Sequence, residues 1–307
     1  MTSRWFSVVP NDAEANLAPA SGRRVHADSD IRELGARAGA EPEISLADFR
    51  RYFPHSPTAL VIKECARLSV VRRYPCPGPV LDVGCGDGLF ARIAFEDAEV
   101  WGIDIDAKEG RWASASKAYA QVILGDVTRA HLPESFFATC VANCSLEHVP
   151  RIDLALQTIK KSLLPGGLAY LFVPNAEWAS QLLSVRLCKQ LRVPFLGLQI
   201  QDSIDRLFRH HHLYDERGWS RVVTDAGLEL VAIEPVLSTA TTVAFEAFLL
   251  PSLAGLVNKH LTTRWTNFPN LRRALARPVF EAVNAIMQRA GDAPTAEFFI
   301  AARRPER

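Results

Sequence analysis

The chain has 307 residues, 48% of them hydrophobic and 22% charged, and its 35 Lys and Arg residues nearly balance its 34 Asp and Glu residues. This composition is typical of a globular chain with a sizeable core, and the balanced charge argues against a protein that binds bulk nucleic acid.

The first 45 residues show little hydrophobic periodicity and are rich in Ala, Arg, Asp and Glu, which predicts a loose arm over 1–45. Charged residues and prolines interrupt its first part, so we expect no signal peptide. The six cysteines form no C-x-x-C pair, which favours free thiols in a reducing cytoplasm. Residues 46–73 then have apolar side chains at helical spacing, for example Leu60, Leu68 and Val71, and are predicted to be helical.

The most specific pattern is the segment 80–88, VLDVGCGDG. It predicts a short apolar strand followed by a loop with glycine at every second position. Glycine at this spacing allows a tight turn and lets a ligand lie on the main chain. A helix expected from about Leu89 would aim its positive end at the same place. We therefore expect a nucleotide-type cofactor at the carboxyl end of this strand.

The charges in this loop separate two candidate cofactors. Dinucleotide-binding domains use G-x-G-x-x-G, whereas the spacing here is G-x-G-x-G. The carboxylates of Asp82 and Asp87 would repel a pyrophosphate, and no Lys or Arg follows until Arg92. S-adenosylmethionine carries an ammonium and a sulfonium, so the acidic loop favours it over NAD.

Segment 80–88 resembles motif I of the class I S-adenosylmethionine-dependent methyltransferases, and similar motifs follow in order. VWGID (100–104) resembles the second strand, whose terminal acid, here Asp104, takes the ribose hydroxyls in that family. Asp104 lies 20 residues after Gly84, as expected for a β-α-β unit. LGDV (124–127) resembles the end of the third strand, where Asp126 would bond the adenine amino group. Segments 141–149 and 163–174 resemble the fourth strand with its exit loop and the fifth strand, most closely in the group that includes quinone-biosynthesis methyltransferases.

The resemblance implies S-adenosyl-L-methionine as the cofactor. The expected cofactor-binding residues are Asp82, Gly84, Cys85, Gly86, Gly88, Asp104, Ile105, Asp126, Val127 and Asn143.

The core alternates strands and helices, which predicts an α/β, Rossmann-like, mostly parallel sheet with helices on both faces. Seven strands are expected near 79–83, 99–104, 121–125, 138–143, 167–173, 228–234 and 296–303. Helices are expected near 89–97, 111–119, 151–163 and 214–226. The long gap before the last strand suggests that it is antiparallel, and the resemblance implies the strand order 3-2-1-4-5-7-6.

Two insertions divide the chain. The predicted core spans 46–235 with an insertion at 175–212, a helical apolar insertion spans 236–293, and 294–307 form the last strand and a tail. Both insertions leave the sheet at the carboxyl ends of strands, where open α/β sheets bind ligands, so we expect them to form the acceptor cover. Between Val236 and Val257 only Glu246 is charged. This apolar stretch indicates either helices packed on the core, or a lipophilic acceptor tunnel or membrane-contacting surface.

Glu147 and His148 follow the fourth strand, beside the expected methyl donor, and are the candidate catalytic residues. Each is either a general base or a packing residue. The run His210–His212 lacks the i, i+4 spacing of paired metal ligands, so a structural role is expected and no metal site is predicted.

These features predict a methyltransferase that acts by direct displacement on a small-molecule acceptor. If the apolar insertion forms a tunnel or a membrane-contacting surface, the acceptor is lipophilic and the protein contacts the membrane peripherally. The alternative is a non-catalytic module that binds S-adenosylmethionine. No pattern indicates an oligomeric state.

Overall fold

The computed structural model describes residues 42–208, 210–262, 264–288 and 296–306. Most of the expected arm over 1–45 lies outside the described residues, as does the end of the expected insertion 236–293. Within the described part, Ile44 is buried in the core, and the Ser45 hydroxyl accepts a hydrogen bond from the Asp48 backbone N–H. Ile44, which the expected arm included, is therefore part of the packed core.

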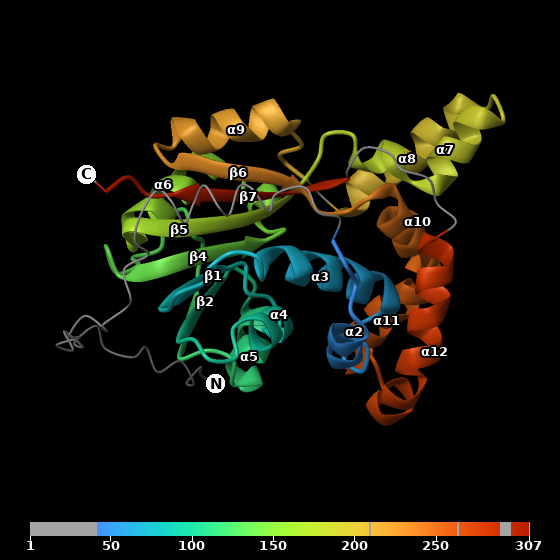
Figure 1. The fold of residues 1–307 in the computed structure, drawn as a ribbon, viewed down its shortest axis with the longest axis horizontal. Helices are drawn as coiled ribbons and strands as arrows, with labels where there is room; N and C mark the ends of the chain where they lie inside the picture. The colour runs from blue at the N-terminus through green and yellow to red at the C-terminus, as the bar shows by residue number, and fades with distance from the viewer. Residues whose placement is uncertain (1–41, 209, 263, 289–295, 307) are drawn as a thin grey trace, which may run out of the picture.

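Seven strands form one sheet in the order β3-β2-β1-β4-β5-β7-β6 (Figure 1). Strands β1 to β5 pair in parallel, whereas β7 is antiparallel to both β5 and β6. This confirms the α/β fold, the strand order and the antiparallel last strand. The strands are β1 (Val80–Val83), β2 (Val100–Asp104), β3 (Gln121–Leu124), β4 (Phe137–Asn143), β5 (Leu163–Pro174), β6 (Glu229–Pro235) and β7 (Glu297–Arg303).

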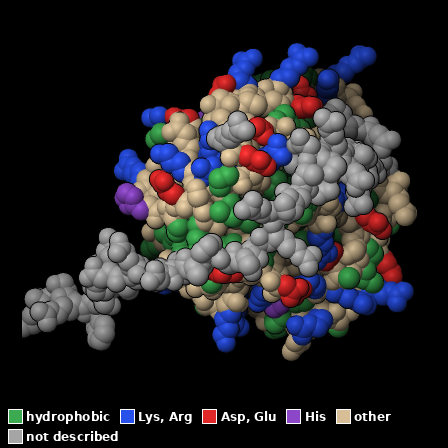
Figure 2. Space-filling view, turned by 60° about the vertical axis from the view of Figure 1, so that its left-hand side comes forward, with side chains coloured by type: hydrophobic (Ala, Val, Ile, Leu, Met, Phe, Trp, Pro, Cys, Tyr) green, Lys and Arg blue, Asp and Glu red, His purple; other side chains and the backbone are tan. Residues whose placement is uncertain are grey.

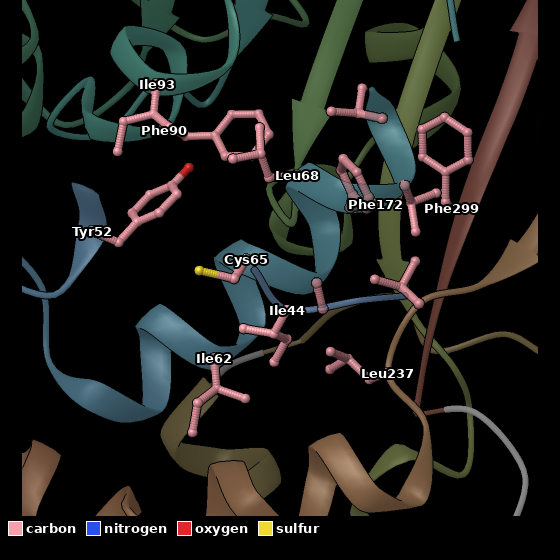
Figure 3. Close-up of a cluster of buried hydrophobic side chains, with 14 of the residues drawn as sticks. Ile44, Tyr52, Ile62, Cys65, Leu68, Phe90, Ile93, Phe172, Leu237 and Phe299 are labelled. Carbon is pink, nitrogen blue, oxygen red and sulfur yellow. The ribbon is translucent and has the colours of Figure 1, made fainter. Parts of the chain in front are cut away.

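Helices cover both faces of the sheet. Successive residues of each strand point to opposite faces, so apolar side chains on each face need a cover of their own. In β5, Tyr170 and Phe172 join one hydrophobic cluster, while Ala169 and Leu171 join the other. The first cluster includes side chains of α3 (Thr58–Val71) and α4 (Leu89–Ala94), and Figure 3 shows a part of it. The second includes α6 (Ile152–Ser162) and α9 (Glu216–Asp225). Helix α5 (Ala107–Ser116) packs against β2, β3 and α4.

The helix expected over 46–73 is broken. It forms α2 (Leu46–Tyr52) and α3, and the linker between them contains Pro54 and Pro57. Proline has no backbone N–H to donate and its ring clashes with the preceding turn, so the helix cannot continue through these residues. The helix expected at 111–119 instead begins at Ala107, because the Asp106 carboxylate caps it by accepting the backbone N–H groups of Lys108 and Glu109.

Both insertions are helical. The first contains the short η2 (Trp178–Gln181), α7 (Leu183–Gln190) and α8 (Pro194–Phe208). The second contains α10 (Thr239–Ala247), α11 (Leu249–Thr262) and α12 (Pro269–Met287). In the described part of the chain, no single helix has the length and apolar character to cross a bilayer, and α10 with the first part of α11 meets that test only as a pair bent by 54°.

Helices α2, α7, α8, α10, α11 and α12 gather at one end of the sheet (Figure 1). Helix α3 joins this group to the sheet, since it packs against α2, α10, α11 and β7. On the face shown in Figure 2, basic and acidic side chains of the described residues are interspersed rather than separated, in keeping with a formal net charge of +1.

Candidate functional site

The loop between β1 and α4 has the backbone that its glycines permit. Gly84, Gly86 and Gly88 have φ values of 74°, 52° and 79°, a left-handed region that side chains disfavour. A Cβ at Gly84 would collide with the side chain of Ser145, whereas one at Gly86 would meet nothing within 4 Å. The main chain at Gly86 is therefore open to a ligand. The loop also contains Cys85, whose side chain is buried.

Asp82 lies in β1, just before this loop, and is 2% exposed. The Tyr119 hydroxyl donates a hydrogen bond of 2.7 Å to its Oδ2. Burial raises the pKa of the Asp82 carboxyl to about 7, although the bond from Tyr119 opposes this rise. A cationic ligand beside it would favour the ionised form.

Asp104 ends β2 and fixes the geometry of the loop. Its Oδ2 accepts the Gly86 backbone N–H at 2.9 Å, and its Oδ1 accepts the Asp106 N–H at 2.8 Å. Ile105, the next residue, is 73% exposed. It provides an uncovered apolar surface beside the acid.

Asp126 follows β3 at the same edge of the sheet, and its Oδ1 accepts both the backbone N–H and the hydroxyl of Thr128. These bonds lower the pKa of the Asp126 carboxyl and keep it ionised. Val127 is buried beneath it. The structure thus places Asp82, Asp104 and Asp126 at the carboxyl ends of adjacent strands.

A cavity of about 270 Å³, here called the loop cavity, lies over the glycine loop. Its floor includes Asp82, Gly84 and Gly86. Its cover comes from parts of the chain that the motifs do not contain, namely Tyr52, Ser56, Leu60, Glu64, Glu109, Lys259 and Trp265.

A second cavity of about 230 Å³, here called the histidine cavity, lies next to the first, and Leu60 and Asn143 line both. Its apolar walls come from α3 and the two insertions, with Leu60, Trp178, Leu182, Leu237 and Phe245. Its polar lining includes Lys63, Arg67, Glu147, His148, His210 and Glu297.

Asn143 ends β4 at the junction of the two cavities. Its amide Nδ2 donates to Glu64 Oε2 at 2.9 Å, while its buried Oδ1 has no hydrogen-bond partner. A buried polar atom without a partner is costly unless a ligand or water satisfies it.

Glu147 and His148 both line the histidine cavity, on the short 3-10 helix η1 (Leu146–His148). Glu147 is 1% exposed, and its Oε2 has no hydrogen-bond partner. Burial raises the pKa of the Glu147 carboxyl to about 7. Its Oε1 lies 3.8 Å from Nε2 of His148, whose side chain is 40% exposed. This pair has the placement and the poised carboxyl that a general base needs.

The three consecutive histidines have different environments. His210 stacks on His148 with ring centroids 5.2 Å apart, and burial lowers the pKa of its imidazole to about 4, so it is neutral. His212 bonds the Val149 carbonyl and the Tyr214 hydroxyl, while the backbone N–H groups of His211 and His212 donate to the Glu147 carbonyl. His212 therefore has the structural role expected for it, whereas His210 belongs to the cavity.

Ligand atoms of Glu147, His148 and His210 lie within 4.8 Å of one another, a spacing that could hold a metal ion. Lys63 and Arg67 line the same cavity, and both lower the pKa of the Glu147 carboxyl. Glu297 pairs with both of these cations, so much of their charge is offset. A buried carboxyl beside two imidazole rings also has the groups that proton transfer needs.

Sequence reasoning expected a structural role for His210 and did not identify Lys259 or Trp265. His210 was visible in the histidine run, but only the fold brings it to His148. Lys259 and Trp265 belong to the insertion between β6 and β7, and no local pattern connects them with a loop formed near residue 86.

The chain matches the methyltransferase domain family over residues 52–233. It is 40% identical to an uncharacterized methyltransferase of Mycobacterium tuberculosis over 91 residues, 29% of this chain and 46% of that protein. It is 34% identical to the ubiquinone biosynthesis O-methyltransferase of Thiobacillus denitrificans over 122 residues, 37% of this chain and 52% of that protein. The chain thus spans about half the length of these curated relatives.

Among solved structures, phosphoethanolamine N-methyltransferase 2 of Haemonchus contortus in complex with S-adenosyl-L-methionine has a TM-score of 0.50 at 16% identity, over 90% of this chain and 60% of that one. This likeness concerns the fold.

The described residues fit the cofactor of this family. The main chain is open at Gly86, acids end three adjacent strands, and buried oxygens of Tyr52 and Asn143 have no partner where they line the loop cavity. The chain belongs to the methyltransferase domain family, as a class I methyltransferase whose cofactor is S-adenosylmethionine.

Proposed function

We propose that the chain transfers the methyl group of S-adenosylmethionine to a small, lipophilic acceptor that loses a proton, such as a phenol. The observation that supports this most strongly is the junction of the two cavities at Leu60 and Asn143. One cavity lies on the glycine loop, and the other combines apolar walls with a cluster of proton-accepting groups. An acceptor in the histidine cavity would thus lie next to a donor in the loop cavity.

Bound S-adenosylmethionine supplies an electrophilic methyl group. The chain's own residues then have three tasks in a direct displacement. Asp82, Asp104 and Asp126 hold the donor, and the apolar walls exclude water and align the acceptor. Glu147, with His148 beside it, takes the acceptor proton, since a group with a pKa of about 7 accepts protons efficiently near neutral pH.

The relatives support this proposal. Several of them are named ubiquinone biosynthesis O-methyltransferases, for example those of Thiobacillus denitrificans and Azoarcus sp.. These names indicate O-methylation on the way to a lipophilic quinone. The alternative of a non-catalytic module is not favoured, because the named relatives are enzymes.

The experiment is turnover by the purified protein with S-adenosylmethionine and two acceptor sets, one of alkyl-substituted phenols and catechols and one of polar amines and carboxylates. We expect S-adenosylhomocysteine to form with the first set, and mass analysis to locate the methyl group on oxygen. Glu147→Gln should lower kcat by about 100-fold or more, the usual contribution of a general base. Turnover confined to the polar set would refute the lipophilic acceptor.

We also propose a cytoplasmic protein that touches the membrane. All six cysteines are free thiols, as expected in a reducing compartment. On α7, α8 and the turn between them, Leu187, Leu191 and Phe195 are exposed. Between Glu177 and Asp202 the only charged residues are Arg186, Lys189 and Arg192. Apolar side chains among basic ones suit an anionic lipid surface, which would bring a lipophilic acceptor close to its cavity.

A further inference from the structure

Lys259 occupies an unusual place for a lysine. It lies on α11, in the insertion between β6 and β7, and its side chain is only 13% exposed. Its ammonium lies 4.7 Å from the ring centroid of Trp112 and 4.3 Å from that of Trp265. It also donates to Oε1 of Glu109 at 2.6 Å. These contacts hold the cation at the loop cavity rather than in solvent.

The charge of the loop cavity is unbalanced. Four of the side chains that line it are carboxylic acids, namely Glu64, Asp82, Asp87 and Glu109. Lys259 is the one cationic side chain among the described residues that line this cavity. The amino-acid end of S-adenosylmethionine carries an ammonium, which the acids suit, and a carboxylate, which they repel.

The glycine loop has few free donors for that carboxylate. The backbone N–H groups of Gly84 and Cys85 donate to the Ile103 carbonyl, and that of Gly88 donates to Cys85. Those of Gly86 and Leu89 donate to carboxylates, and the indole N–H of Trp265 donates to Asp87.

The Tyr52 hydroxyl, by contrast, is available. It lines the same cavity, is fully buried and has no hydrogen-bond partner. In Figure 3 the oxygen of Tyr52 points toward Phe90, another residue that lines the cavity. Burial raises the pKa of this phenol, so it keeps its proton and donates. A buried donor without a partner indicates a missing acceptor.

We propose that Lys259 is the counter-ion of the cofactor's α-carboxylate and that the Tyr52 hydroxyl is its second donor. This inference rests on the proposed function and adds a binding residue from a part of the chain outside the glycine-loop motif. It makes the second insertion part of the donor site as well as of the acceptor cover.

Calorimetry with two ligands tests this. S-adenosylhomocysteine has the carboxylate, whereas 5′-methylthioadenosine has the same adenosine and sulfur without the amino-acid end. We expect Lys259→Gln to weaken S-adenosylhomocysteine about tenfold to hundredfold, the usual effect of losing a charged hydrogen bond, and to leave 5′-methylthioadenosine unchanged. Lys259→Arg should restore much of the lost affinity for S-adenosylhomocysteine. Tyr52→Phe should weaken S-adenosylhomocysteine to a smaller extent, again without changing the affinity for 5′-methylthioadenosine.

Lys108→Gln is the matched control. Its ammonium lies 5.0 Å from the Trp112 ring, but it does not line the loop cavity, so both affinities should stay unchanged. An equal loss of both ligands in Lys259→Gln would show a general role in holding the cover and overturn the proposal, as would no loss at all. If the unaltered protein bound neither ligand, the proposed function would fail, and this inference with it.

Discussion

At the scale of single residues, Glu147 links stability to pH. Its pKa is about 7 in the folded protein, above the ordinary 4.5, because burial disfavours the charged form. The folded state therefore binds the proton more tightly. This contribution to the free energy of unfolding is complete below pH 4.5 and declines as pH rises toward 7, by about 3 kcal/mol.

We expect Glu147→Gln, which cannot ionise, to decline less in stability than the unaltered protein between pH 5 and pH 7. Urea unfolding at several pH values measures the difference between the two proteins. Parallel curves would show that Glu147 is ionised throughout and would remove the reason for treating it as a base poised near neutrality.

Asp82 makes cofactor binding stronger as pH rises, whereas Glu147 makes the fold less stable. Its carboxyl has a pKa of about 7, and the cofactor's positive charge interacts with the ionised form. Affinity for S-adenosylmethionine should therefore increase between pH 6 and pH 8, with release of a proton on binding. Calorimetry in buffers of different ionisation enthalpy counts that proton. Asp82→Asn should bind more weakly and lose this pH dependence, whereas a steep dependence in that variant would assign it to another group.

At the scale of elements, a buried ion pair fastens α3 to β7. Arg67 Nε and Nη2 lie 2.6 and 2.7 Å from the two carboxylate oxygens of Glu297, and both residues are buried. Without Arg67, the buried Glu297 carboxylate would keep, among the described residues, only Lys63 as a cationic partner, at 3.4 Å. Arg67→Leu should lower the free energy of unfolding by about 3–5 kcal/mol in denaturant titrations. The double variant Arg67→Leu with Glu297→Leu should regain part of this loss. Equal losses in the single and the double variant would mean that the packing of the arginine side chain, and not its charge, accounts for the lost stability.

The elements also show what could be predicted from the sequence. Strands such as β1 and β4 were predictable because each is a short, nearly all-buried apolar run. The site residues on them followed from motif spacing. The break in the expected helix 46–73 was missed although its prolines were visible, because the apolar period continues across it. Lys259 was out of reach, since only tertiary packing brings α11 to Trp112 and Glu109.

At the scale of the whole molecule, the exposed tip between α7 and α8 predicts lipid binding. Leu191 is 73% exposed and Phe195 71% exposed, with Arg192 between them. We expect the protein to sediment with vesicles that contain anionic phospholipid and not with neutral ones. Leu191→Ser with Phe195→Ser should abolish this, since each loses apolar area that would enter the interface.

The matched control for this tip is Leu261→Ser, which alters a residue 79% exposed on α11, away from the basic segment. It should keep vesicle binding and the oligomeric state unchanged. Loss of binding in Leu261→Ser alone would move the membrane contact to the second insertion. Self-association that disappears in the tip variant would identify the tip as a contact between copies of the chain.

The linker between α2 and α3, together with the first turn of α3, is bonded to the second insertion at several points. The Ser252 hydroxyl accepts the Ala59 N–H, the Thr266 hydroxyl donates to the Pro54 carbonyl, and Arg272 donates to the carbonyls of Phe53 and Ser56. Because these bonds join the two segments, we expect them to move together when a ligand beneath them leaves. We expect departure of the spent donor, rather than methyl transfer, to set the pace of turnover. Rapid mixing should then show a burst of methylated product equal to the enzyme concentration, and a first turnover no faster than later ones would contradict this.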